Sequence, residues 1–471
     1  MSTDVLLERP GLDAVEKLRS VIRGEVLVAG DAGYDGARAV WNGMIDRHPA
    51  VIVRCQGAAD VMAAVAFARE HRLPVSTRGG AHNVAGHAVC DQGLMVDLSA
   101  MRGVRVDPER RLAWVEGGAI WRDVDRETQA FGLAVPGGLI SDTGVGGLTL
   151  SGGIGWLRSR HGLTIDNLVS ADVVTADGRL VHAGRGENAD LLWALKGGGG
   201  NFGIVTTFEF ALHPAGPKLM FCAPLYPIAA GSEPIRFWRD FLADKNGDVG
   251  SVVEFSTIPH DPEYPEQYWG RRIYTLAAVY AGDADEGERL LQPLRELGEV
   301  VTDFSGQMNY CDIQQLFDTL IPFGQYRCYW KSRYLSGLGD DAIDRIVEGN
   351  ENPPSPNTLS SIWNFGGATA EVATADSAFG DRSMAYMCSI DSIWEGSAND
   401  HVNIAWTRDF WQRLEPYSDR GRIYLNFAGF GEEGEELVRR SYGPNFAKLA
   451  EIKRKYDPQN VFRFNQNIAP G

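Results

Sequence analysis

The chain has 471 residues, more than a single hydrophobic core usually serves, so two or three domains are expected. Hydrophobic residues make up 44% of it and charged residues 23%, which is typical of a soluble globular protein. The 62 Asp and Glu against 45 Lys and Arg give a net charge of −17, which argues against nucleic acid and acidic lipid as partners.

The cysteines and the amino terminus indicate where the protein works. Six cysteines stand singly with no Cys-x-x-Cys pair, which predicts reduced thiols rather than a disulfide framework. Residues 1–24 carry charges throughout and lack the apolar run of a signal peptide. No window of the sequence reaches the apolar length needed to cross a bilayer. We therefore expect a cytoplasmic protein with no membrane partner.

The first predicted elements in chain order are a strand, a helix and a strand at 50–54, 58–71 and 74–78. Apolar residues in the middle segment recur at the spacing of a helix packed on a sheet. Strands joined in this way should be parallel, and ligands gather beyond the carboxyl ends of such strands. The segment from Arg78 to His82 lies at that position.

Further strands and a helix complete the first half. The apolar patterns predict two strands and a helix at 94–99, 111–118 and 120–132. The pair Asp177-Gly178 predicts a hairpin within 172–183, because this dipeptide suits a tight turn between strands. Proline and glycine then interrupt the pattern at 213–218, where we expect the first domain to close.

The second half is richer in aromatic residues. Candidate strands, separated by helices at 285–298 and 340–349, are found at 271–282, 327–337, 360–372 and 383–394. This pattern predicts an antiparallel sheet that carries helices. The fold class expected is therefore α+β, with residues 1–215 as one domain, 216–415 as a second domain, and 416–471 returning to complete the first.

Three glycine-rich runs, at 77–87, 142–156 and 196–203, are the most distinctive motifs. The third contains Gly-x-Gly-x-x-Gly at Gly198, Gly200 and Gly203, the fingerprint of dinucleotide-binding Rossmann folds. Its context is reversed, because a helical segment precedes it and a strand-like segment follows. Three unrelated surface loops are the alternative, although each run adjoins an apolar element. Backbone N–H groups freed by glycine bind anions, so together the runs suggest a diphosphate ligand.

A histidine, His82, lies within the first run. It could be bonded to nearby backbone for purely structural reasons. A metal site with His87 and Cys90 is a second reading, but a fourth ligand is missing and the spacing is not that of a helix.

The motifs "RGGAHNVAGH", "VDLS", "GVGGLTLSGGIGW", "LLWALKGGGGNFGIVT" and "YDPQNVFRFNQNI" resemble, in order and almost end to end, a known family. They are similar to the FAD-linked oxidases of the vanillyl-alcohol oxidase and PCMH superfamily. The nearest subgroup is that of the berberine-bridge-enzyme-like proteins, which includes bacterial 6-hydroxy-D-nicotine oxidase. The resemblance implies a PCMH-type FAD-binding domain of two α+β subdomains, FAD as cofactor, and a substrate domain built on an antiparallel sheet.

The resemblance also explains His82. In the family, the histidine at this position is bonded through a ring nitrogen to the 8α-carbon of the flavin, and neighbouring backbone amides hold the diphosphate. Many relatives attach the flavin a second time, through a cysteine in Cys-Pro-Thr-Val-Gly-Val-Gly-Gly-His. Here Ile140 takes the place of that cysteine and Leu148 that of the histidine, so we expect attachment through His82 alone.

The resemblance implies a set of FAD-binding residues. Thr143 falls where the residue that controls oxygen access is usually valine, a similarly small β-branched side chain, so oxidase behaviour is expected. Asn465 and Asn467 belong to the C-terminal segment that approaches the isoalloxazine in relatives, although strand-end amides need no function. The full set expected is His82, Arg78, Gly79, Gly80, Ala81, Asn83, Thr143, Gly144, Gly147, Gly152, Gly153, Gly155, Asn201, Gly203, Ile204, Val205, Asn465 and Asn467.

Tyr424 is the predicted catalytic residue. "RIYLNF" resembles the family's Tyr-x-Asn segment, in which the tyrosine often serves as a base or as the partner of one. A free tyrosine has a pKa near 10, so a cation or the flavin must lower it; Lys331 and Arg422 are candidate helpers. The alternative is a tyrosine that only packs in a sheet.

The substrate is expected to meet Trp363, Asn364 and Tyr386, which lie in the aromatic-rich half. Sheet packing is the alternative for these residues. Asp381 stands where many relatives have histidine, and nicotine oxidase lacks a tyrosine at the position of Tyr424. Both differences set this chain apart from that enzyme's route of amine oxidation.

The function expected is an oxidase that takes hydride from a small-molecule alcohol or hemiacetal C–H bond, after which O₂ reoxidises the flavin and yields H₂O₂. Oxidation of a C–N bond is the second choice. A dehydrogenase that passes electrons to another acceptor, and a flavin-storing protein without turnover, are the remaining alternatives.

Overall fold

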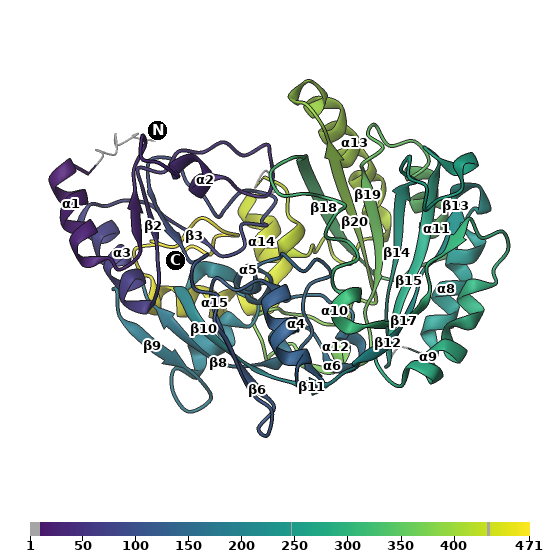
Figure 1. Cartoon of the computed structure of the whole chain (residues 1–471), viewed down its shortest axis with the longest axis horizontal. Helices are drawn as coiled ribbons and strands as arrows, with labels where there is room; N and C mark the ends of the chain where they lie inside the picture. The colour runs from purple at the N-terminus through teal and green to yellow at the C-terminus, as the bar shows by residue number, and fades with distance from the viewer. Residues whose placement is uncertain (1–9, 246, 431–433) are drawn as a thin grey trace.

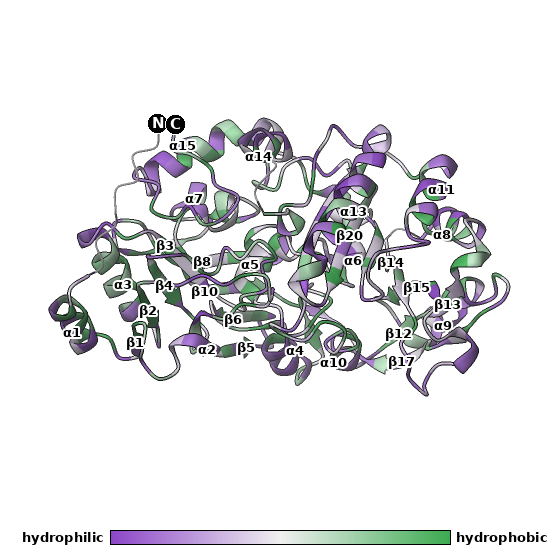
Figure 2. Ribbon diagram, turned by 90° about the horizontal axis from the view of Figure 1, so that it is seen from above, coloured by the Kyte–Doolittle hydropathy of each residue, from purple (hydrophilic) through white to green (hydrophobic). Residues whose placement is uncertain are grey.

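This computed structural model describes residues 10–245, 247–430 and 434–471. Within these residues the strands form four sheets, and helices cover their outer faces (Figure 1). In Figure 2 the strands of the amino-terminal half are mainly hydrophobic and lie between helices with hydrophilic outer faces. Not one of the described helices combines the length and apolar character that a membrane span requires.

The first sheet is mostly parallel, as the sequence predicts. Its order is β1-β2-β4-β3, in which β2 and β3 both run parallel to β4 while β1 is antiparallel to β2. The two predicted strands are therefore not direct neighbours, because β4 lies between them. Helix α3 packs its apolar stripe into the core of this sheet. The elements are α1 (Leu12–Val21), β1 (Glu25–Leu27), α2 (Tyr34–Arg38), β2 (Val51–Arg54), α3 (Ala58–Glu70), β3 (Val75–Arg78) and β4 (Leu94–Asp97).

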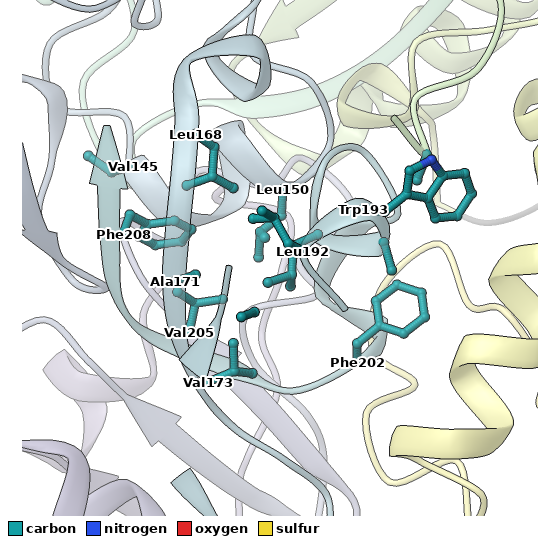
Figure 3. Packing of buried hydrophobic residues seen from close by; sticks show 14 of the residues in the cluster. Val145, Leu150, Leu168, Ala171, Val173, Leu192, Trp193, Phe202, Val205 and Phe208 are labelled. Atoms are coloured by element: carbon teal, nitrogen blue, oxygen red, sulfur yellow. The ribbon is translucent and has the colours of Figure 1, made fainter. Parts of the chain in front are cut away.

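The second sheet is antiparallel, in the order β5-β6-β10-β8-β9. The predicted hairpin joins β8 to β9, and Gly178 in its turn has φ +83°, which favours glycine. Figure 3 shows the core on this sheet, where Phe208 and Val205 of β10 face Leu192 and Phe202. The elements are β5 (Val104–Asp107), β6 (Leu112–Glu116), α4 (Trp121–Gln129), α5 (Val145–Leu150), α6 (Arg158–His161), β8 (Leu168–Val174), β9 (Leu180–Ala183), α7 (Ala189–Leu195) and β10 (Ile204–Ala211).

A short pair of strands, β7 (Leu133–Ala134) and β11 (His213–Pro214), closes this half of the chain. The carboxyl-terminal helices α14 (Gly434–Tyr442) and α15 (Phe446–Tyr456) then return to it. Their residues Leu449 and Ile452 are buried in the same cluster as Phe208. The tail thus packs against the second sheet, more than two hundred residues away in sequence (Figure 1).

The predicted antiparallel sheet of the second half has nine strands. Its order is β16-β13-β15-β14-β19-β20-β18, with β12 joining β15 to β17. One face is covered by helices α8, α9, α11 and α13, and the other face turns toward the first half of the chain (Figure 1). The strands are β12 (Lys218–Cys222), β13 (Pro224–Pro227), β14 (Val249–Thr257), β15 (Arg272–Tyr280), β16 (Thr302–Asp303), β17 (Gly306–Asn309), β18 (Arg327–Leu335), β19 (Leu359–Asn364) and β20 (Tyr386–Trp394). The helices are α8 (Glu233–Ala243), α9 (Ala284–Leu291), α10 (Tyr310–Ile313), α11 (Asp340–Gly349), α12 (Ala368–Glu371) and α13 (Asp400–Arg413).

Candidate active site

A cavity lies between the two halves of the molecule, and all three glycine-rich runs border it. The runs are therefore parts of one site rather than unrelated surface loops. The inner face of the nine-stranded sheet forms another wall, and the tail contributes 424–427 and 464–466. Of the residues predicted from the sequence, those that border the cavity are Gly79, Gly80, Ala81, His82, Asn83, Thr143, Gly144, Gly147, Gly203, Ile204, Val205, Asn465, Trp363 and Tyr424.

The first two glycine runs touch each other through their backbones. A Cβ added at Gly80 would lie 2.3 Å from the nitrogen of Gly144, and a Cβ at Gly144 would lie 2.3 Å from the nitrogen of Gly80. Only glycine permits this approach, which brings two sets of backbone N–H groups to one wall. At Gly147, by contrast, an added Cβ would meet open space.

Several residues predicted to bind the cofactor do not border the cavity. Gly153 and Gly155 pack against Thr164 and the Gly137 carbonyl, where an added Cβ would lie 2.1 Å and 1.9 Å from the nearest atoms. These contacts explain the glycines by close packing. The residues that the structure places away from the cavity wall are Arg78, Gly152, Gly153, Gly155, Asn201 and Asn467.

Two of these displaced residues still shape the site. Asn201 is buried and ties the third glycine run to the tail, because its Nδ2 donates to the Gln466 carbonyl and its Oδ1 accepts from the Ile468 N–H. Arg78 lies 3.8 Å from Asp97 and donates to the Ala37 carbonyl within α2 and to the Ala39 carbonyl just after it. Both side chains therefore hold the walls of the site in place.

His82 lies in the cavity wall with its ring held on two sides. Its Nε2 is 2.8 Å from Asp142 Oδ1, at the distance of an ion pair, although the ring N–H is not aligned with the oxygen. Its ring stacks on Trp41, with centroids 5.1 Å apart. Burial acts to raise the pKa of Asp142, but His82 and Arg122 outweigh it, so the pKa lies below its usual range.

The metal reading of the first glycine run gains no geometric support. Among the residues that the structure describes, no three His, Cys, Asp or Glu side chains come together as a metal site. Burial, aided by Arg47, lowers the pKa of His87 to about 4, so this histidine is neutral near pH 7.

The Tyr424 hydroxyl oxygen accepts two hydrogen bonds. The Gly153 N–H donates to it over 3.1 Å and the Asn426 side-chain amide over 2.8 Å. Burial raises the pKa of Tyr424 to about 12, and these two donors act in the opposite direction. The tyrosine is not part of a sheet, because the segment around it forms a 3₁₀ turn at Leu425–Phe427.

The two candidate helpers of Tyr424 point elsewhere. Arg422 forms an ion pair with Asp419 and lies 3.4 Å from Asp381. The Lys331 ammonium lies 4.5 Å from the centre of the Trp411 ring. Neither residue borders the cavity, so the sequence-based suggestion that they lower the Tyr424 pKa has no support from their positions.

The alternation of β19 divides the predicted substrate residues. Trp363 faces the cavity, whereas Asn364 faces the opposite side, where its Oδ1 accepts hydrogen bonds from the Arg158 guanidinium and the Ser251 N–H. Tyr386 also lies on the far side of the sheet, with its ring 6.1 Å from that of Trp238. The expected contacts of Asn364 and Tyr386 with substrate are therefore corrected, and both residues belong to the packing behind the wall.

Two carboxyl groups in the cavity wall, the half-buried Glu254 and the buried Asp391, were not identified from the sequence. Glu254 accepts a hydrogen bond from the Ser361 hydroxyl, and Asp391 Oδ2 accepts one of 2.9 Å from the Ser389 hydroxyl. Asp391 Oδ1 is buried without a hydrogen-bond partner. Burial raises the pKa of Glu254 to about 8 and that of Asp391 to about 7. The sequence feature that could have identified each of them is a single acidic residue within a mainly apolar strand.

Aromatic and aliphatic side chains fill the rest of the substrate side. The ring of Phe427 lies at its centre, 5.0 Å from Tyr424, 5.4 Å from Trp330 and 6.2 Å from Trp363. Among the described residues that border the cavity there is no Lys, Arg or Cys. The cavity thus offers acidic groups to a ligand but no Lys or Arg from the described residues.

Two segments of the chain that border the cavity match models of known protein families. Residues 49–184 match the model of the FAD binding domain, and residues 423–469 match that of berberine and berberine like proteins. An FAD-linked oxidoreductase of Dictyostelium discoideum is 30% identical over 452 residues, which cover 95% of each chain.

Solved structures share the whole architecture. The 6-hydroxy-D-nicotine oxidase of Arthrobacter nicotinovorans is 28% identical and superposes with a TM-score of 0.85, covering 96% of this chain and 98% of that one. The glucooligosaccharide oxidase of Acremonium strictum, described as carrying a 6-S-cysteinyl, 8α-N1-histidyl FAD, is 24% identical with a TM-score of 0.85. The superposition covers 97% of this chain and 99% of that one. At 24% identity, the similarity shows a shared fold only.

The residues around the cavity fit an FAD molecule. Three glycine-rich runs present backbone rather than side chains, as a diphosphate requires. Beside the third run, Asn465 Oδ1 and Gln466 Nε2 are buried polar atoms without hydrogen-bond partners in the described chain, and both residues border the cavity. Ile140 and Leu148, which the sequence resemblance places at the positions of the relatives' cysteine and histidine, also border the cavity.

The cavity, the two matched segments and the full-length relatives lead to one assignment. The chain belongs to the FAD-linked oxidoreductases of the PCMH and berberine-bridge-enzyme-like superfamily.

Proposed function

We propose that this chain is an oxidase that removes hydride from the C–H bond of a small-molecule alcohol or hemiacetal. In this proposal FAD is attached to His82, and O₂ takes up the electrons to give H₂O₂. The observation that carries it is Tyr424, a residue that borders the cavity and whose hydroxyl oxygen accepts two N–H hydrogen bonds. When bound, FAD supplies the hydride acceptor.

Tyr424 acts as the base. The N–H groups of Gly153 and Asn426 point at its oxygen and so stabilise the phenolate, which accepts the proton of the substrate hydroxyl as hydride leaves. The rings of Phe427, Trp330 and Trp363 hold the apolar part of the substrate and exclude water. Without the loss of this O–H proton, removal of hydride would leave an unstable cationic product.

The proposed attachment to His82 has two supports. The imidazole lies in the wall of the cavity, beside the backbone nests that fit a diphosphate. The related glucooligosaccharide oxidase carries a histidyl FAD. No cysteine among the described residues borders the cavity, so a single attachment is proposed.

Anaerobic bleaching of the flavin tests the donor class. The protein is mixed without oxygen with a panel of sugars, aromatic and terpenoid alcohols, and cyclic amines, and absorbance of the oxidised flavin is followed. An alcohol should bleach it, and admission of air should restore the colour and release one H₂O₂ per turnover. Bleaching that persists in air would indicate a dehydrogenase. Photoreduction of a flavin that no donor bleaches would indicate a storage protein.

Oxidation of an amine is the second candidate, and a specific observation favours it. Glu254 and Asp391 border the cavity, where no described Lys or Arg opposes them, and a protonated amine would neutralise an ionised carboxylate there. The similarity to nicotine oxidase agrees with this alternative. Bleaching by cyclic amines but by no alcohol in the same panel would establish it in place of the first.

A further inference from the structure

The loop that carries Asp142 is fixed on both sides. On one side, Asp142 Oδ1 lies 2.8 Å from His82 Nε2. On the other, the neighbouring Ser141 gives its N–H and its hydroxyl to Asp318, over 2.8 Å and 2.6 Å, and Asp318 also receives the Arg122 guanidinium at 2.8 Å. The Asp142 carboxylate is thus held against the imidazole by contacts that do not involve His82.

The His82 ring is fixed as well. It stacks on Trp41, and the backbone N–H of Trp41 donates to the carbonyl of Ala81. Ala81 has φ +58°, a left-handed conformation that costs a residue with a side chain about 1 kcal/mol or more. Strain of this kind immediately before a reactive side chain is found where its direction matters.

We propose that Asp142 is a positioning residue for the attachment of FAD to His82, holding the proton on Nε2 and leaving the lone pair on Nδ1. A carboxylate next to one ring nitrogen fixes the neutral imidazole in the tautomer that is protonated on that nitrogen. It also stabilises the positive charge that develops on the ring as Nδ1 forms a bond. This inference rests on the proposed attachment at His82.

The attachment step balances in the following way. A bond forms between His82 Nδ1 and the 8α-carbon of the flavin, and one C–H bond of that methyl group breaks. The methyl proton, the imidazole proton and one electron pair are transferred to the isoalloxazine. The flavin is thereby left in its two-electron reduced state. O₂ then accepts two electrons and two protons as H₂O₂, and the flavin is returned to its oxidised form.

The experiment separates binding from attachment. Apoprotein prepared from flavin-deficient cells is mixed with FAD, binding is measured by flavin fluorescence quenching, and attachment is measured by fluorescence of the acid-denatured band over time. For Asp142→Asn we expect FAD affinity within about threefold of the wild type but attachment slower by about tenfold or more. Asp318→Asn loosens the same loop but leaves the Asp142 carboxylate in place, so it should slow attachment clearly less than Asp142→Asn does.

A second pair of variants guards against a loss of folding. Asp142→Glu and Asp142→Gln are matched in size, so the carboxylate should attach FAD faster than the amide. The role of Asp142 would be overturned if FAD attached equally fast to the wild type and Asp142→Asn, and to Asp142→Glu and Asp142→Gln. It would also be overturned if Asp318→Asn attached FAD as slowly as Asp142→Asn. If the wild type binds FAD but never attaches it, the proposed bond to His82 itself is wrong, which is a different outcome from failure at Asp142 alone.

Discussion

At the scale of single residues, the hydroxyl of Tyr424 has the environment of a proton acceptor, but burial keeps its pKa near 12. Only a small fraction is ionised near neutral pH, and this fraction grows about tenfold with each pH unit below the pKa. In the proposed mechanism the ionised form of Tyr424 is the active one, so activity should increase as the pH rises. The N–H groups of Gly153 and Asn426 limit how far the pKa is raised.

The first prediction concerns this base. For the wild type, kcat/KM should rise by up to about tenfold per unit between about pH 7 and 9, whereas Tyr424→Phe should lose about 10²-fold to 10⁴-fold in rate and most of the pH dependence. Tyr334→Phe is the matched control, because Tyr334 is buried in the same cluster but does not border the cavity. A Tyr424→Phe enzyme with the wild-type pH profile would rule out this role.

The second prediction concerns Glu254. Its folded pKa of about 8 exceeds its ordinary value of 4.5, so the unfolded chain ionises first as the pH rises. The contribution of Glu254 to the free energy of unfolding is therefore fully present below about pH 4.5. It is lost as the pH rises from about 4.5 to about 8. Glu254→Gln should remove this decline and stabilise the apoprotein at pH 8 by about 1–2 kcal/mol, as measured by urea unfolding. The control Glu109→Gln, at an exposed residue, should leave this decline of stability with pH unchanged. If the stability of Glu254→Gln still declines with pH, the decline does not come from Glu254.

At the scale of elements, one buried ion pair fastens the tail to the third glycine run. The Lys453 ammonium of α15 donates to Asp457 Oδ2 over 2.6 Å, to the Asn201 carbonyl over 2.8 Å and to the Phe462 carbonyl over 2.9 Å. Both charged side chains are fully buried. Removal of one partner leaves an unpaired buried charge, which is far more costly than the loss of a surface ion pair.

The third prediction tests this fastening. Lys453→Met should destabilise the protein by about 3–5 kcal/mol and expose the tail to proteolysis. Lys455→Met on the same helix breaks an ion pair with Asp190 that lies at the surface, and should cost at most about 1 kcal/mol. Chemical denaturation and limited proteolysis of the two variants provide the measurement. Equal losses in both would show that the buried pair does not hold the tail.

Much of the fold could be predicted element by element, because periodicity is a local property. The strands around 51–54 and 75–78 and the hairpin at Gly178 occur where their patterns indicate. The residues of the cavity wall were harder to predict from the sequence. The alternation of side chains along a strand places Trp363 and Asn364 on opposite faces but does not show which face meets the cavity. Glu254 and Asp391 belong to no motif, and only the pairing of β14, β19 and β20 brings them to one wall.

At the scale of the whole molecule, the cavity is enclosed by both halves of the chain, so a ligand bound in it connects them. Binding to the folded state alone stabilises it by mass action, by about 2.7 kcal/mol when the ligand is present at 100 times its Kd. No described Lys or Arg borders this cavity, so we expect backbone N–H groups of the glycine runs to hold the diphosphate.

The fourth prediction follows from this arrangement. Addition of FAD to His82→Ala apoprotein should raise its melting temperature, with a shift that grows with the logarithm of FAD concentration. Riboflavin, which lacks the diphosphate and adenosine, should give a smaller shift at the same concentration. Differential scanning fluorimetry measures both. Equal shifts for the two compounds would argue against a diphosphate held by the glycine runs.

The most direct test of the account is the mass of the acid-denatured protein, followed by peptide mapping. The wild type should carry the added mass of one FAD on the peptide that contains His82, and His82→Ala should carry none while still binding FAD before denaturation. A wild-type protein that releases all of its flavin in acid, or one that keeps it on another residue, would contradict the account.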